Sequence, residues 1–138
     1  MNRVTIRLLA LLVIAPLYVI AAQEKKSATP AKQQEVVEFT DKTEVAGVIL
    51  EGKYLVIHDP SKSEKGETCF YLYKYAAGGD PEQIALKEKP VVMFHCKPEE
   101  RAQVKETVLT VGMSPKAPGL FELKGIQFRG SNVLHVLL

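Results

Sequence analysis

The stretch EVAGVILEGKYLVIH, residues 44–58, decides the fold that the sequence predicts for this chain. Aliphatic and β-branched side chains flank Glu51 and Gly52, and a glycine at the first position of a two-residue turn is typical of a type II′ β-hairpin. In that register Leu50 faces Leu55 across the two strands, so both side chains share one face of the hairpin. We expect this face to join the hydrophobic core.

Strand-like runs continue beyond this hairpin, separated by turn-forming residues roughly every ten positions, a spacing typical of β-sandwiches and small barrels. The sequence therefore predicts an all-β fold, either a small antiparallel barrel or a sandwich. The remaining strands are expected at residues 69–75, 90–96, 107–113, 120–128 and 133–138.

At most one short helix is expected, within residues 97–106. Pro98 followed by Glu99 and Glu100 is a helix-start signal, because proline suits the first helical position and carboxylates suit the positive end of the helix dipole. A helix in the middle of a small barrel suggests an OB-like arrangement. Residues 59–68, rich in turn formers, are expected to form a loop, as are residues 76–83.

The first residues have the pattern of a secretory signal peptide. Arg3 and Arg7 precede an apolar run at residues 8–21 that ends in a small side chain. A retained membrane anchor is the alternative, but a spanning helix needs about 20 apolar residues, more than this run contains. We expect residues 1–22 to be a cleaved signal peptide. The protein would then be secreted or periplasmic, as in a bacterium, without stable membrane insertion.

A polar segment, QEKKSATPAKQQ at residues 23–34, follows the predicted signal peptide. It lacks the apolar side chains that would offset the entropy lost on ordering, so we expect a disordered linker. The rest of the chain, residues 35–138, is the right length for a single small β domain.

The charge balance argues against nucleic-acid binding. The chain has 18 basic and 16 acidic side chains, and two of the basic ones, Arg3 and Arg7, belong to the predicted signal peptide. The remaining chain carries no net charge, whereas nucleic-acid binders normally have a surplus of lysine and arginine. We expect a partner of another kind: a protein, a peptide or a component of the cell envelope.

The two cysteines, Cys69 and Cys96, are expected to form a disulfide, because an even cysteine count in an exported protein favours one. The alternative is a pair of reduced thiols buried as small hydrophobic side chains.

The histidines suggest a further alternative, a copper or zinc site. The chain has three, His58, His95 and His135, and together with the cysteines they form a soft ligand set. The metal-site hypothesis takes His58, His95 and Cys96 as its first ligands. However, no pair of these residues has a known metal-binding spacing. We therefore expect no metal and no other cofactor, with the histidines placed separately.

Three tyrosines, Tyr71, Tyr73 and Tyr75, alternate along one predicted strand and therefore share one face. A row of tyrosines could stack on sugars, peptides or bases, since each ring is apolar with a polar tip. The alternative is that tyrosine is simply a good strand residue on the outside of a barrel.

No catalytic motif is present: the sequence contains no nucleophile elbow, no phosphate-binding glycine loop and no zinc-protease motif. We therefore assign no catalytic residues and expect no catalysis. The leading hypothesis is an exported, non-catalytic binding module that uses the tyrosine row. A periplasmic metal-binding protein with histidine and cysteine ligands is the first alternative, and an enzyme of unknown type is the second.

Overall fold

The computed structural model of the chain describes residues 31–138. The predicted signal peptide, residues 1–22, and most of the predicted linker, residues 23–34, lie outside this part. The first strand begins at Gln33, so the end of the predicted linker belongs to a strand. Within the described part, no helix has the length and apolar character to cross a membrane.

The two longest strands, β1 (Gln33–Val45) and β2 (Val48–His58), form an antiparallel hairpin. They are joined by Ala46 and Gly47, which both have positive φ, at 47° and 86°. Positive φ at both central residues is the requirement of a type I′ turn, the turn that best matches the twist of a hairpin.

The predicted turn at Gly52 is therefore wrong, because Gly52 lies inside β2 opposite Phe39. The pairing register shifts between Phe39 and Thr43, where β1 has more residues than β2, so Gly52 lies next to a bulge in β1 rather than in a turn. Leu50 and Leu55 are both buried, but only Leu50 belongs to the main core cluster.

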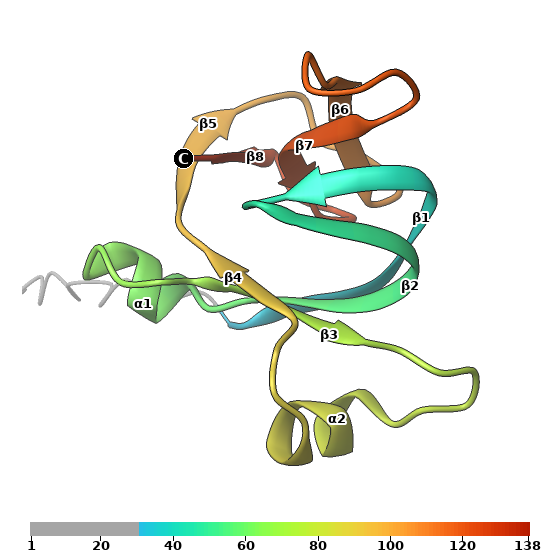
Figure 1. Cartoon of the computed structure of the whole chain (residues 1–138). Helices are drawn as coiled ribbons and strands as arrows, with labels where there is room; N and C mark the ends of the chain where they lie inside the picture. The colour runs from blue at the N-terminus through green and yellow to red at the C-terminus, as the bar shows by residue number, and fades with distance from the viewer. Residues whose placement is uncertain (1–30) are drawn as a thin grey trace, which may run out of the picture.

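The remaining strands complete one curled, nearly closed sheet in the order β4-β3-β2-β1-β7-β8-β5, with β6 paired to β7 (Figure 1). The pairing is antiparallel except between β1 and β7. This barrel-like sheet confirms the predicted all-β class. Its other members are β3 (Phe70–Lys74), β4 (Val92–Phe94), β5 (Cys96–Glu100), β6 (Val108–Met113), β7 (Phe121–Gln127) and β8 (Val133–Leu137).

Two short helices were not predicted: α1 (Pro60–Glu64) lies within a predicted loop, and α2 (Pro81–Lys87) begins in the predicted loop at residues 76–83 and extends beyond it. Each follows an aspartate, Asp59 or Asp80, whose carboxylate accepts a backbone N–H of the first turn, with proline at the start of the helix. An aspartate directly before a proline was the sequence signal for both helices.

The helix predicted within residues 97–106 is wrong. Residues Cys96–Glu100 form strand β5, and Pro98 lies opposite His135 of β8. The residue before Pro98 is Lys97, which has no side-chain oxygen to accept the free backbone N–H groups of a helix start. Pro98 is tolerated because β5 is an edge strand, paired only with β8.

The core fills the inside of the curled sheet and contains a stack of phenylalanines. The rings of Phe70 and Phe94 are nearly parallel, with centroids 4.9 Å apart, and Phe128 lies 6.0 Å from Phe70. Two buried histidines, His58 and His135, extend this aromatic cluster toward the place where the sheet closes. The candidate site is therefore built into the end of the core.

Candidate metal centre

Four soft side chains converge where the two edges of the sheet meet. His58 is the last residue of β2, and Cys69 immediately precedes β3, whose Phe70 lies opposite His58. A single residue after β4 leads to Cys96, the first residue of β5. His135 lies in the middle of β8, which pairs with β5.

Three of these side chains lie close enough together to share one metal ion, and the fourth, His135, contacts Cys96. The two cysteine sulfurs are 3.3 Å apart, and the Cys96 sulfur lies 3.6 Å from His135 Nδ1 and 4.0 Å from His58 Nε2. The ligand atoms of His58, Cys69 and Cys96 all lie within 4.8 Å of one another. Zinc bond lengths to sulfur and nitrogen imply ligand–ligand distances of about 3.4–3.8 Å in a tetrahedron. His58, Cys69 and Cys96 are therefore near these distances, whereas the ring of His135 has to move closer to the other two ligands to complete a tetrahedron.

The cluster is shielded from solvent. Cys69, His58 and His135 have relative exposures of 1%, 3% and 6%, and Cys96 is half-buried. The His58 ring stacks on Phe70 at 4.6 Å, and Phe128 lies 6.1 Å from His135. Such an apolar shell limits solvent access and lowers the local dielectric constant, both of which tune a metal site.

Burial sets the protonation state of the ligands. It lowers the pKa of His58 to about 4, with a further contribution from the neighbouring His135, and it lowers the pKa of His135 to about 4. Both imidazoles are therefore neutral near pH 7 and keep a lone pair for a metal. Burial, followed by the hydrogen bond with Cys69, raises the pKa of the Cys96 thiol to about 12. A protonated thiol is a weak nucleophile, so Cys96 reacts only after it has lost its proton.

Gln33 orients one of the histidines. Its side-chain oxygen lies 3.2 Å from His58 Nδ1. An amide oxygen only accepts hydrogen bonds, so Nδ1 donates and Nε2 keeps the lone pair that faces Cys96. Metal-binding histidines commonly donate their second ring nitrogen to an oxygen in this way. Sequence reasoning missed this residue, because it placed Gln33 in a linker.

The histidine next to Cys96 lies outside the cluster. His95 is exposed, and its Nε2 is 3.3 Å from Thr68 Oγ1. Of the three ligands in the metal-site hypothesis, His58 and Cys96 come together and His95 does not. The other two members of the cluster are Cys69 and His135. They are distant from Cys96 in sequence and are brought to it only by the pairing of β3 and β8 with their neighbouring strands.

The expected disulfide is not formed in this structure: Cys69 and Cys96 are both free thiols. The two sulfurs nevertheless lie 3.3 Å apart.

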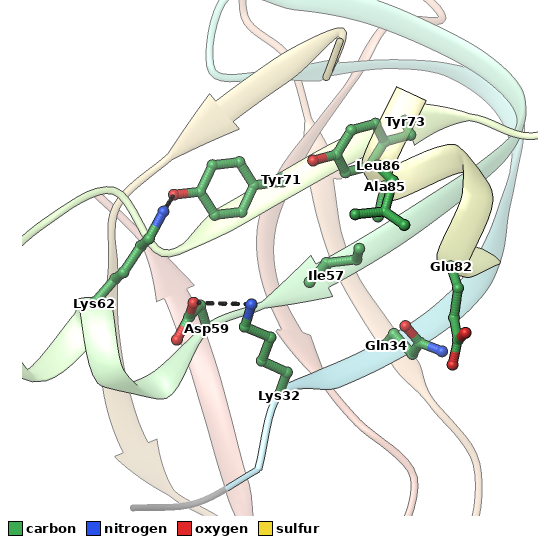
Figure 2. A pocket seen from close by; sticks show the side chains of 10 residues that line it. All are labelled: Lys32, Gln34, Ile57, Asp59, Lys62, Tyr71, Tyr73, Glu82, Ala85 and Leu86. Atoms are coloured by element: carbon green, nitrogen blue, oxygen red, sulfur yellow. Dashed lines mark hydrogen bonds and ion pairs between the residues drawn. The ribbon is translucent and has the colours of Figure 1, made fainter. Parts of the chain in front are cut away.

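The tyrosine row is divided between two places. Tyr71 and Tyr73 line a groove of about 430 Å³ on the outer face of the sheet, between β3 and the overhanging helix α2 (Figure 2). Lys62 donates a hydrogen bond to the Tyr71 hydroxyl at 2.8 Å, and that hydroxyl donates to the Thr68 carbonyl. Tyr75 lies beyond the end of β3 and donates instead to the Gly79 carbonyl.

Comparison with known proteins gave no match to a protein-family model, a curated protein or a solved structure. A fold does not by itself define a function, so the function has to be argued from the chemistry of the site. The most specific chemistry in the described part of the chain is the cluster of two thiols and two neutral imidazoles.

Proposed function

We propose that this domain binds one transition-metal ion through Cys69, Cys96, His58 and His135. The observation that carries the proposal is the convergence of His58, Cys69 and Cys96, whose ligand atoms lie within 4.8 Å of one another, with His135 Nδ1 3.6 Å from the Cys96 sulfur as the nearest fourth ligand. Two further features support it: the imidazoles are neutral near pH 7, and Gln33 holds His58 in the tautomer that a metal needs.

Zinc is the ion that suits this ligand set best. Thiolate and imidazole ligands select zinc or copper over calcium and magnesium, which take oxygen ligands. Two cysteines and two histidines in a tetrahedron form a common zinc site. Cu⁺ is the competing ion, because it also accepts soft ligands.

A zinc ion bound here would have all four positions occupied by protein side chains. Closed sites of this kind hold a fold together, whereas catalytic zinc sites keep a position open for water. The ion would tie β2 and the start of β3 to β5 and β8, across the place where the sheet closes. We therefore propose a non-catalytic, exported metal-binding domain, with its location resting on the predicted signal peptide.

Zinc titration of the reduced, untagged protein tests this function. We expect one equivalent of Zn²⁺ to bind in competition with a colorimetric zinc indicator, and Cys96→Ser to abolish stoichiometric binding. His95→Ala is the matched control, because this neighbouring histidine lies outside the cluster. Its affinity should equal that of the wild type. The proposal fails if the reduced wild-type protein binds no zinc, and a clear preference for Cu⁺ would change the assigned ion.

We also propose a second candidate function, peptide binding in the tyrosine groove. A volume of about 430 Å³ falls within the usual range for ligand sites. The groove combines an apolar floor, formed by Ile57 and the two tyrosine rings, with Lys62 and Glu82 near its rim (Figure 2). This suits a peptide with one apolar side chain between an acidic and a basic residue.

NMR titration with short synthetic peptides of that pattern tests the second function. Shifts should be largest at Tyr71 and Tyr73, and Tyr73→Ala should remove them. Tyr75→Phe should bind normally, because Tyr75 lies outside the groove. Absence of any shift at millimolar peptide would end this hypothesis without affecting the metal site.

A further inference from the structure

The two cysteines of the proposed metal centre are also positioned to react with each other. Their sulfurs are 3.3 Å apart, and the nearby side chains of His58 and His135 do not separate them. In a tetrahedral zinc site two sulfurs lie about 3.8 Å apart, whereas in a disulfide they are joined at about 2.05 Å. One pair of sulfurs cannot satisfy both arrangements, so metal binding and disulfide formation exclude each other.

We propose that the Cys69–Cys96 pair makes metal binding depend on its redox state, with the dithiol binding the ion and the disulfide releasing it. This inference rests on the proposed metal-binding function. It adds a form of regulation that is relevant to the predicted export, because exported proteins meet conditions that favour disulfides.

The oxidation needs an external oxidant, which we take to be a small-molecule disulfide. The thiolate of one cysteine attacks this disulfide, forms a mixed disulfide and displaces one thiol. The second cysteine then attacks the mixed disulfide, which closes the Cys69–Cys96 bond and displaces a second thiol. The two protons lost by the cysteines are taken up by the two released thiolates, and two electrons pass to the oxidant.

The structure indicates which cysteine reacts first. Cys96 is half-buried, whereas Cys69 is only 1% exposed. An external disulfide therefore reaches Cys96 more easily, and Cys69 resolves the mixed disulfide from the inside. Bound metal would block this route, because it occupies the sulfur lone pairs that make the attack.

Because metal binding and disulfide formation exclude each other, the reduction potential of the cysteine pair should depend on the concentration of free zinc. A metal that binds only the dithiol stabilises the reduced state and raises the reduction potential of the cysteine pair. For a two-electron couple, each tenfold increase in free zinc above the dissociation constant should raise the potential by about 30 mV.

Redox titrations of the full domain in glutathione buffers, at several buffered zinc concentrations, test the proposal. The fraction of disulfide is measured by alkylation and mass spectrometry. For the wild type and for His95→Ala, we expect each tenfold increase in free zinc to shift the equilibrium constant between disulfide and dithiol tenfold toward the dithiol. His135→Ala keeps both cysteines but lacks one ligand, so its oxidation should respond to zinc only at much higher concentrations.

The outcomes separate the two proposals. If reduced protein binds zinc but the potential does not change with zinc, the oxidised protein binds equally well and redox control is wrong. Failure of the metal-free protein to form an intramolecular disulfide, even in strongly oxidising buffer, would overturn it as well. If the reduced protein binds no zinc, the metal-binding function itself fails.

Discussion

The proposed metal centre and the tyrosine groove lie on opposite faces of the same two strands. His58 and Ile57 are neighbours on β2, yet His58 points into the buried cluster and Ile57 lines the outer groove. Phe70 and Tyr71 divide in the same way on β3. Successive side chains of a strand alternate between its faces, so adjacent residues enter environments of very different polarity.

This difference predicts how strongly each face responds to change. In the buried cluster, charge is costly and polar atoms depend on one another. In the groove, a polar group such as the Lys62 ammonium can exchange its partner, the Tyr71 hydroxyl, for water. We therefore expect large effects of metal, pH and substitution on the inner face and small ones on the outer face.

Zinc binding should have the largest effect on the stability of the domain. At a free concentration about a thousand times its dissociation constant, an ion that binds only the folded, reduced protein stabilises it by about 4 kcal/mol. Thermal or urea unfolding followed by circular dichroism, with and without zinc, measures this gain. The double variant Cys69→Ser and Cys96→Ser should gain nothing, and equal midpoints for the wild type in zinc and in chelator would contradict the proposal.

Acid should have the next largest effect on stability, measured in the metal-free, reduced protein. His58 and His135 have pKa values of about 4 in the folded state against an ordinary value of 6.5. Between these values the unfolded chain binds more protons than the folded one, so stability falls as the pH drops from 6.5 to about 4. The loss is on the order of 3 kcal/mol for each histidine.

Urea unfolding at a series of pH values measures this loss. A metal-free protein whose stability is flat between pH 6.5 and 4 would show that the two imidazoles are hydrated rather than buried.

The sequence predicted the class of fold because alternation and turn residues are local signals. It misplaced the first hairpin because Gly47 and Gly52 are both plausible turn glycines. The choice between them depends on pairing along the whole length of β1, including Gln33, which composition assigned to a linker. Likewise Pro98 favoured a helix locally, but pairing with β8 makes this segment a strand.

The metal centre was only half predictable for the same reason. His58 and Cys96 were singled out together, but no spacing connects them to Cys69 or His135. His95 was included because it is one of only three histidines in the chain. It is also adjacent to Cys96, and neighbouring residues on or beside a strand send their side chains to opposite faces. The register of β5 against β8, which places His135 opposite Pro98, is what completes the ligand set.

Removing the hydrogen-bond partner of one ligand should lower zinc affinity moderately. Gln33→Ala takes away the oxygen that accepts from His58 Nδ1 and leaves the four proposed ligands in place. Loss of such a supporting hydrogen bond typically weakens metal binding 10- to 100-fold, so zinc competition should show a loss of about that size. The neighbouring variant Gln34→Ala should bind like the wild type, and equal affinities for all three proteins would remove Gln33 from the site.

The smallest effect is expected on the outer face, from Tyr71→Phe. This change removes a hydroxyl that donates to the Thr68 carbonyl and accepts from Lys62, and keeps the ring that lines the groove. Both partners are near solvent and can bind water instead, so the loss of stability should be about 1 kcal/mol or less. Urea unfolding measures it.

The same variant tests whether the two faces are independent. Tyr71 is adjacent to Phe70, whose ring stacks on His58 at 4.6 Å, so a disturbance of β3 would reach the metal centre through this contact. If the strand is rigid, Tyr71→Phe should bind zinc with unchanged affinity. The inner and outer side chains are joined only through the backbone of β3, and the Tyr71 hydroxyl contacts groups on the outer face alone. A clear loss of zinc affinity would show that Lys62 and Tyr71 hold β3 in the register that the metal centre needs.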